Sequence, residues 1–400
     1  MPVRKFILVS MQSWDIGIGS NCKNIALELA RTHKVLYVNF ALDRFTAWRA
    51  GTDPVTQKRK AVLRQQVDDL EQVQENLWVL TPRVMLESIN WLPPGWLFDK
   101  LNYRNNQLLA GAIQLAAKRL NFDSFVLLND NMIERGLYLK ELLKPTAYLY
   151  YLRDHLITVP YHRKHGKKAQ ELLIAKANAV VANSGYLASF AEQYNPKSFM
   201  VGQGCELEQF LEDGIAEAPE LQNIPAPRIG YIGYLTALRL DLALLIGMAK
   251  QRPAWQFVLV GPEDEAFAQS ELHSLPNVHF LGNKQPASLP KYLKGFDVAL
   301  NPQLVNELTV GNYPRKIDEY LAMGKPTVST ATPFMEYFKD SVYLATDLED
   351  FLRLIALALQ EDDEARALAR RETASAHSWE NSVAAILNTL DNTLHKESEY

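Results

Sequence analysis

Residues 306–330 read NELTVGNYPRKIDEYLAMGKPTVST, and this stretch predicts a loop, a short helix and a strand. Pro314 suits the first helical position, because its missing N–H would have no partner there. Gly324 suits a left-handed helix end, and Pro326 prevents the helix from continuing. Short apolar runs alternate with such helices along the whole chain, which is typical of parallel sheets covered on both faces.

Two charged residues of the predicted helix need an explanation. Lys316 lies in the first turn, where unpaired N–H groups and about half a positive charge favour phosphate. Glu319 follows on the same side of the helix, where a carboxylate could accept both hydroxyls of a ribose. A Lys–Glu pair on an ordinary surface helix has the same spacing, so the spacing by itself leaves both interpretations open.

The composition of the 400 residues is that of a globular protein, with 48% hydrophobic and 22% charged residues. The length predicts two domains. Only two cysteines, Cys22 and Cys205, argue against a disulfide framework and a cysteine-based zinc site. The first apolar run is too short for a secretion signal or a membrane span, so we expect a cytoplasmic protein.

The net charge of −4 conceals an asymmetry. Residues 1–200 carry 26 Lys and Arg against 17 Asp and Glu, whereas residues 201–400 carry 16 against 29. A basic half suits an anionic surface or substrate, although solvated surface helices would give the same difference.

The pattern predicts an α/β fold of two doubly wound, Rossmann-like domains whose strand ends form a cleft. The acidic, proline-containing stretch Leu211–Pro227 predicts the linker. The first domain would span residues 1–210, with a final helix at 378–400 packing back on it, and the second residues 226–377.

Each domain begins with a strand followed by glycines. Gly17 and Gly19 would let backbone N–H groups approach an anion, although Cys22 replaces the third glycine of a dinucleotide fingerprint and a tight turn is the alternative. In the second domain, Gly233 is followed by Arg239 at the start of a predicted helix, again an anion-binding arrangement unless Arg239 pairs with Asp241.

A charge-assisted hydrogen bond contributes about 1.5–3 kcal/mol, so Arg239 and Lys316 could hold a diphosphate without a metal. The triplet at residues 129–131, Asn-Asp-Asn, lacks the second carboxylate of a DxD metal motif.

Several motifs together resemble a known family: GYIG…R, FVLVGP, NVHFLG, FDVALNP and KxxEYLAMGKP in the second half, with ANAVVANSGYLASF and FMVGQGCELEQF before them. They resemble the retaining glycosyltransferases of family 4 (glycosyl transferases group 1), which implies a GT-B fold. The resemblance covers nearly the whole chain and is most specific at residues 314–328.

The resemblance implies roles for individual residues. Glu319 would bind the ribose of a nucleoside-diphosphate sugar, and Arg239 and Lys316 its diphosphate. Gly311 stands where the family has a second glutamate for the sugar hydroxyls, so Glu307, Asn312 or backbone amides of 310–313 would replace it. The implied donor site comprises Gly17, Gly19, Gly233, Arg239, Gly282, Asn283, Gly311, Asn312, Tyr313, Lys316 and Glu319.

On the acceptor side, Asp154 and His155 follow a predicted strand of the first domain. Asp154 could orient the acceptor and either residue could contact the donor sugar, although Asp154 could instead be a helix cap or an arginine partner. With Arg239 and Lys316 they form the predicted catalytic group. The basic run at 162–168 could attract anionic lipid headgroups, and the loop WLPPGWLF at 91–98 could touch a membrane or pack in the core.

The resemblance thus implies an enzyme of polysaccharide biosynthesis for the cell envelope, which we expect to be cytoplasmic. It would transfer a sugar with retention from a UDP- or GDP-sugar to a hydroxyl of a glycan or lipid-linked saccharide, without a metal, a cofactor or nucleic acid, and with peripheral contact to an anionic membrane. Two alternatives remain: a nucleotide-sugar epimerase on the same fold, and a non-catalytic nucleotide-sugar-binding protein.

Overall fold

The computed structural model describes residues 3–15, 20–49, 53–153, 164–212, 214–306, 309–310 and 313–398. The chain divides into two compact units. The first domain comprises Met1–Gln203 together with Trp379–Tyr400, and the second comprises Gly204–Ser378.

The first domain contains a sheet whose described strands follow the order β3-β4-β2-β1-β5-β6-β7-β8. All neighbouring pairs are parallel except β3 and β4. The central strands are apolar and buried, as expected for a parallel sheet covered on both faces. The strands are β1 (Lys5–Ser10), β2 (Lys34–Val38), β3 (Leu70–Gln74), β4 (Leu77–Leu80), β5 (Val126–Asp130), β6 (Ala147–Leu152), β7 (Ala179–Ala182) and β8 (Ser198–Met200).

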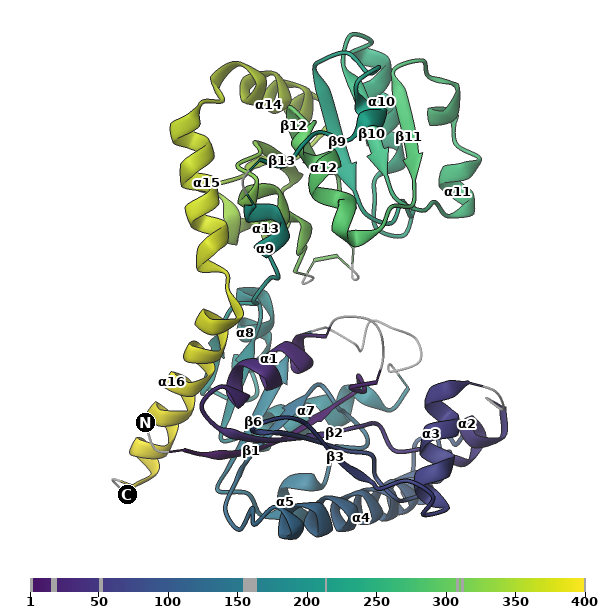
Figure 1. Ribbon diagram of the computed structural model, residues 1–400, viewed down its shortest axis with the longest axis vertical. Coiled ribbons are helices and arrows are strands. Elements are labelled where there is room, and N and C mark those ends of the chain that lie inside the picture. The colour runs from purple at the N-terminus through teal and green to yellow at the C-terminus, as the bar shows by residue number, and fades with distance from the viewer. Residues whose placement is uncertain are drawn as a thin grey trace. The chain divides into compact units, whose positions relative to one another are not determined.

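Helices cover this sheet, and the last helix of the chain is one of them (Figure 1). Val383, Ile386 and Leu390 of the last helix are buried in the same core cluster as Ile25 and Leu29 of the first. The helices are α1 (Asn21–Ala30), α2 (Arg44–Arg49), α3 (Pro54–Leu63), α4 (Trp96–Arg119), α5 (Leu139–Leu143), α7 (Gly166–Lys176), α8 (Gly185–Glu192) and α16 (Trp379–Ser398).

The second domain contains a fully parallel sheet with the order β11-β10-β9-β12-β13-β14. Its strands are β9 (Arg228–Ile232), β10 (Gln256–Val260), β11 (Val278–Gly282), β12 (Val298–Asn301), β13 (Thr327–Thr330) and β14 (Tyr343–Ala345). Its helices are α9 (Glu208–Leu211), α10 (Leu242–Gln251), α11 (Glu265–Ala268), α12 (Leu289–Lys294), α13 (Lys316–Ala322), α14 (Leu348–Glu361) and α15 (Glu364–Ala376), with 3-10 turns at Pro219–Leu221, Glu271–Ser274, Pro286–Ser288 and Met335–Phe338.

The predicted linker at Leu211–Pro227 is wrong. Ala218, Leu221 and Ile224 are buried in the core cluster of the second domain, together with Phe296 beside β9. The acidic and proline residues of this stretch suggested a linker, but the apolar side chains between them pack against the sheet. The chain therefore passes into the second domain after Gln203, earlier than the predicted boundary at residue 210.

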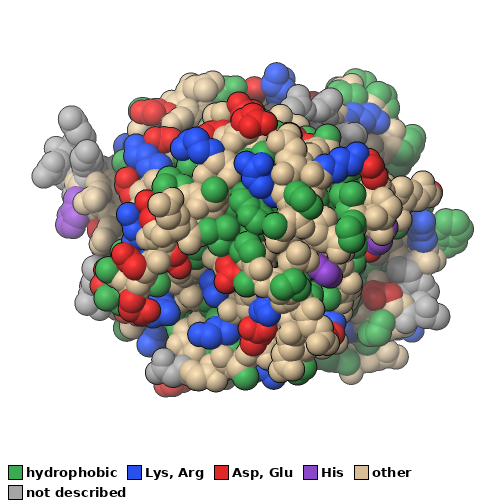
Figure 2. Space-filling model, turned by 90° about the horizontal axis from the view of Figure 1, so that it is seen from above, with side chains coloured by type: hydrophobic (Ala, Val, Ile, Leu, Met, Phe, Trp, Pro, Cys, Tyr) green, Lys and Arg blue, Asp and Glu red, His purple; other side chains and the backbone are tan. Residues whose placement is uncertain are grey.

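Two surface properties bear on function. Among the described residues no helix is long and apolar enough to span a membrane. On the face shown in Figure 2, acidic and basic side chains of described residues are interspersed rather than separated by sign.

Candidate active site

A pocket of about 830 Å³ opens in the second domain where β9 ends and α13 begins. In open parallel sheets, ligands bind at the carboxyl ends of the strands, and this pocket lies at such an end. Its walls consist of Tyr231, Ile232, Gly233, Tyr234, Thr236, Leu238, Arg239, Leu240, Leu289, Gln303, Tyr313, Pro314, Arg315, Lys316 and Glu319.

Glycines keep one wall of the pocket narrow and composed of backbone. Gly233 has φ +144°, and a Cβ there would lie 2.9 Å from both the Lys316 ammonium nitrogen and the Tyr231 hydroxyl oxygen. A Cβ at Gly261 would lie 1.9 Å from the Gly233 carbonyl oxygen. Both positions therefore require glycine, so that a ligand and Lys316 can approach the backbone closely.

Lys316 reaches across the pocket to the end of β9. Its ammonium group donates a hydrogen bond to the Tyr231 hydroxyl and lies 4.0 Å from the centroid of that ring. Within the described part of the chain, no ion pair joins Lys316 to Glu319. The interpretation as an ordinary surface pair is therefore wrong, and the ammonium faces the pocket instead.

Arg239 also lines the pocket, but it does not begin a helix as predicted. Helix α10 begins at Leu242, and the Asp241 side chain caps it by accepting the Leu244 N–H at 2.9 Å. This cap occupies Asp241, and Arg239 forms no ion pair within the described residues. The arginine instead lies in a loop fixed by its backbone, whose carbonyl accepts the Leu304 N–H at 2.8 Å.

Glu319 is the carboxylate of the pocket. Burial raises the pKa of the Glu319 carboxyl to about 7, although neighbouring Arg315 and Lys316 lower it. A carboxylate kept in an unfavourable environment beside cations is a feature of functional sites. When ionised, it could accept two hydroxyl hydrogens of one ligand.

Helix α13 differs in detail from its prediction. Its regular part begins at Lys316, two residues after Pro314, and its end is confirmed because Gly324 has φ +68°. Tyr320 fixes the helix to β9, because its hydroxyl accepts the Ile232 N–H at 2.9 Å.

A buried network supports the helix from behind. The Tyr313 hydroxyl donates to Asp318 Oδ2 at 2.6 Å, and the Cys205 thiol donates to the same oxygen at 3.0 Å. His377 Nδ1 lies 2.5 Å from Asp318 Oδ1, within hydrogen-bond distance, and its Nε2 lies 2.9 Å from the Tyr337 hydroxyl oxygen. Because Tyr313 lines the pocket, this network positions one of its walls.

The remaining predicted residues fall into two groups. Gly282 ends β11 with φ +69°, and its carbonyl accepts the Gly261 N–H at 2.9 Å, but neither it nor exposed Asn283 is among the pocket-lining residues. The others lie outside the described residues: Gly17, Gly19, Asp154, His155, Glu307, Gly311 and Asn312.

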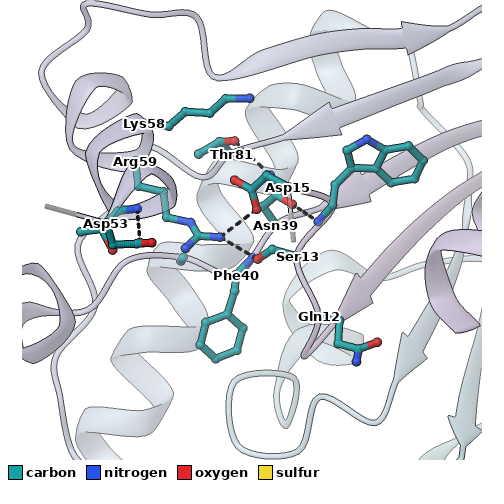
Figure 3. Close-up of polar contacts among 12 residues, drawn as sticks. Gln12, Ser13, Asp15, Asn39, Phe40, Asp53, Lys58, Arg59 and Thr81 are labelled. Atoms are coloured by element: carbon teal, nitrogen blue, oxygen red, sulfur yellow. Dashed lines mark hydrogen bonds and ion pairs between the residues drawn. The ribbon is translucent and has the colours of Figure 1, made fainter. Parts of the chain in front are cut away.

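The first domain has a second polar site, at the carboxyl ends of β1, β2 and β4 (Figure 3). Arg59 Nη2 of α3 donates to the Ser13 hydroxyl at 2.7 Å and to Asp15 Oδ1 at 3.3 Å. Asn39 accepts the Trp14 N–H at 2.7 Å. Within the described residues, Asp15 Oδ2 and Arg59 Nε are buried without a hydrogen-bond partner.

Sequence reasoning did not identify Tyr231, Arg315, Asp15 and Arg59 as site residues. Tyr231 lies within the motif GYIG…R quoted above, so the sequence did carry a signal for it. Arg59 lies in a predominantly polar helix whose position beside the first strand no local pattern reveals.

Comparisons with known proteins agree with this geometry. Residues 226–361 match the family model described as glycosyl transferases group 1. TuaH of Bacillus subtilis (strain 168), whose name describes a glycosyltransferase of teichuronic acid biosynthesis, is 30% identical over 243 residues. The matched region covers 57% of this chain and 60% of TuaH, less than two thirds of that relative.

Solved structures resemble the chain over almost its whole length. Anabaena Alr3699/HepE in complex with UDP has a TM-score of 0.64 and 15% identity, covering 97% of this chain and 100% of that one. Sucrose-phosphate synthase (tll1590) from Thermosynechococcus elongatus has a TM-score of 0.63 and 15% identity, covering 98% and 100%. At these identities the likeness shows the fold, and the predicted GT-B class is confirmed.

Proposed function

Because residues 226–361 match the model of the family glycosyl transferases group 1, we propose that this protein is a glycosyltransferase that takes its sugar from a nucleoside-diphosphate sugar. One observation carries the proposal. Lys316, Arg239 and Arg315 line the same pocket as the carboxylate of Glu319. Cations that can hold a diphosphate thus lie beside an acceptor for ribose hydroxyls.

The cationic side chains and the carboxylate would bind different parts of the donor. Lys316 and Arg239 would bind the diphosphate near the Gly233 backbone, and Glu319 would accept hydrogen bonds from the ribose hydroxyls. The base would then lie toward Gly282 and Asn283. Uracil is the first candidate, because HepE, which shares the fold, was crystallised with UDP.

We propose that the reaction proceeds with retention and without a metal. The bond between the anomeric carbon and the phosphate oxygen breaks while the acceptor oxygen bonds to that carbon from the same face. The departing phosphate oxygen takes the acceptor's proton. Arg239 and Lys316 stabilise the charge that develops on the diphosphate, so positioning and electrostatics supply most of the rate.

The acceptor would be a hydroxyl of a glycan or a lipid-linked saccharide. Its binding would involve the first domain, where Asp154 and His155 remain proposed contacts. The name of TuaH motivates assignment to cell-envelope polysaccharide assembly at the cytoplasmic side of the membrane.

The test begins with binding and proceeds to turnover. Thermal shifts of the full-length protein with UDP, GDP and ADP should identify one stabilising nucleotide. Glu319→Ala should then raise the donor KM strongly, whereas Glu372→Ala, an exposed change on α15, should leave it unaltered.

The proposal fails if no nucleotide stabilises the protein or if Glu319→Ala retains the wild-type KM. Conversion of the donor sugar without any acceptor would favour an epimerase, and nucleotide binding without release of a sugar would favour a non-catalytic binding protein.

A further inference from the structure

Part of the surface of the first domain is unusually rich in exposed aromatic side chains. Trp48 is 81% exposed, Trp91 and Trp96 are each 75% exposed, and Phe45 and Leu97 are 52% and 42% exposed. Large apolar side chains that gather on a surface mark an interaction site more often than chance exposure. We call these five side chains the aromatic surface.

Hydrogen bonds connect helix α2 to the segment before α4 and bring Phe45 and Trp91 to neighbouring positions on the surface. The Arg44 N–H donates to the Leu86 carbonyl at 3.1 Å, and the Phe45 N–H donates to the Ser88 hydroxyl at 2.8 Å. The Trp91 indole N–H donates to the Ser88 carbonyl at 2.8 Å. Phe45 and Trp91 therefore meet at one residue.

Further along α2, the ring of Trp48 lies 6.2 Å from the ring of Phe45, measured between centroids. Figure 1 shows α2 at one end of the first domain. Phe45 and Trp48 thus form one group of rings on α2. The hydrogen bonds of Phe45 and Trp91 to Ser88 place Trp91 next to this group.

The core beneath this segment is already filled, so its tryptophans cannot turn inward. Ile89, Leu92 and Phe98 form their own buried cluster. The Phe98 ring stacks on His165 at a centroid distance of 3.8 Å, and His165 Nε2 lies 3.0 Å from the Leu92 carbonyl oxygen. Of the two alternatives for the loop at 91–98, core packing holds for Leu92 and Phe98. Trp91, Trp96 and Leu97 are exposed, and their contact with a membrane stays a prediction.

Cations border the aromatic surface. Exposed Arg49 lies 5.9 Å from the centroid of the Phe45 ring, and the Lys164 ammonium nitrogen lies 3.3 Å from the Trp91 carbonyl oxygen. Lys100 and Arg104 are exposed on the first turns of α4.

The acidic groups nearby are largely neutralised. Glu87 pairs with Arg44 at 2.8 Å and Asp43 with Arg135 at 3.0 Å, which leaves Asp99 as the exposed acid of α4's first turn. The border of the aromatic surface is therefore net positive.

We propose that the aromatic surface binds this protein peripherally to a bilayer that contains anionic lipids. Tryptophan is the side chain that favours the headgroup region of a membrane, because its ring is apolar and its indole N–H is polar. Exposed cations at its edge are complementary to anionic headgroups. The inference does not depend on the nucleotide pocket, which lies in the other domain.

The test uses the full-length protein and lipid vesicles without any nucleotide. The protein should sediment with vesicles of phosphatidylcholine mixed with phosphatidylglycerol, and tryptophan emission should shift to the blue as the indoles leave water. Vesicles of phosphatidylcholine alone should bind it at least about tenfold more weakly, because the cations lose their partners.

Substitution of the tryptophans by serine tests how much the aromatic surface contributes to vesicle binding. The triple variant Trp48→Ser, Trp91→Ser, Trp96→Ser should lose at least about tenfold in affinity for the mixed vesicles. The matched control is Leu115→Ser, which is 68% exposed on α4 and lies roughly 28 Å along that helix from Trp96. It should bind as the wild type does.

Several outcomes would overturn the proposal. These are failure of the wild type to bind mixed vesicles, equal binding to both vesicle types, or an unchanged affinity of the triple variant. Thermal unfolding of the triple variant is the folding control. If its transition matches that of the wild type, a loss of vesicle binding is not caused by loss of structure. Because no nucleotide is present, failure here leaves the glycosyltransferase proposal untouched.

Discussion

Replacing Glu319 by glutamine should stabilise the protein at neutral pH while weakening nucleotide binding. Burial raises the pKa of the Glu319 carboxyl from 4.5 to about 7. Since a tenfold change in proton affinity corresponds to about 1.4 kcal/mol, ionised Glu319 costs the folded protein about 3 kcal/mol. This is an upper value, because the side chain lines a pocket that solvent enters.

The pH dependence of this effect has a definite sign. In the unfolded chain the carboxyl ionises around pH 4.5, whereas in the folded protein it ionises around pH 7. The contribution of protonated Glu319 to stability is therefore fully present below about pH 4.5 and is lost as the pH rises through about 7. Glu319→Gln, which stays neutral, should match the wild type in acid and be more stable above pH 7.

Thermal unfolding of both proteins across this pH range measures the effect. In a domain of this size, about 3 kcal/mol corresponds to a rise in Tm of roughly 6 °C or more. In the same samples, affinity for UDP should fall about ten- to one-hundredfold, because a charged hydrogen-bond acceptor is lost. Glu372→Gln, at an exposed position, is the control. A Tm difference independent of pH, or a variant less stable at pH 8, would refute the reasoning.

Three further substitutions test other parts of the site, and a fourth serves as a control. Arg239→Ala should reduce kcat/KM for the donor at least about tenfold without changing Tm, because its guanidinium lines the pocket and forms no ion pair within the described residues. Gly233→Ala should abolish UDP binding in calorimetry, since its Cβ would lie 2.9 Å from the Lys316 nitrogen, whereas Gly111→Ala, with open space in α4, should raise Tm slightly. Asp318→Asn should lower the free energy of unfolding by about 1–3 kcal/mol in denaturant titrations, because the buried carboxylate that accepts hydrogen bonds from Tyr313 and Cys205 is lost. Wild-type values for Arg239→Ala or Gly233→Ala would contradict the pocket assignment, and an unchanged Asp318→Asn would remove the supporting role of the network.

The sequence predicted the fold class because most strands of the two sheets are short apolar runs bounded by turns. It did not predict β3, whose polar sequence LEQVQ is exposed and pairs antiparallel with β4. It also took the acidic stretch at 211–227 for a linker, because burial of Leu221 and Ile224 depends on distant partners that no local pattern shows.

The candidate site was predicted where local chemistry sufficed. The spacing of Lys316 and Glu319 left a surface pair and a ligand site equally open, and the family resemblance favoured the ligand site. In the structure both residues line one pocket. The helix start assigned to Arg239 was wrong, because Asp241 is the better cap and displaces the helix toward the C-terminus. Arg59 and Asp15 lie 44 residues apart in the sequence, so only the folded chain shows that they meet.

The claim that Glu319 binds the ribose is tested most directly by a thermodynamic cycle. Calorimetry would compare UDP with 2′,3′-dideoxy-UDP on the wild type and on Glu319→Gln. The account predicts that removing the two hydroxyls weakens binding to the wild type at least about tenfold and has little further effect on the variant, because both changes remove the same contact. Equal losses on both proteins would contradict it.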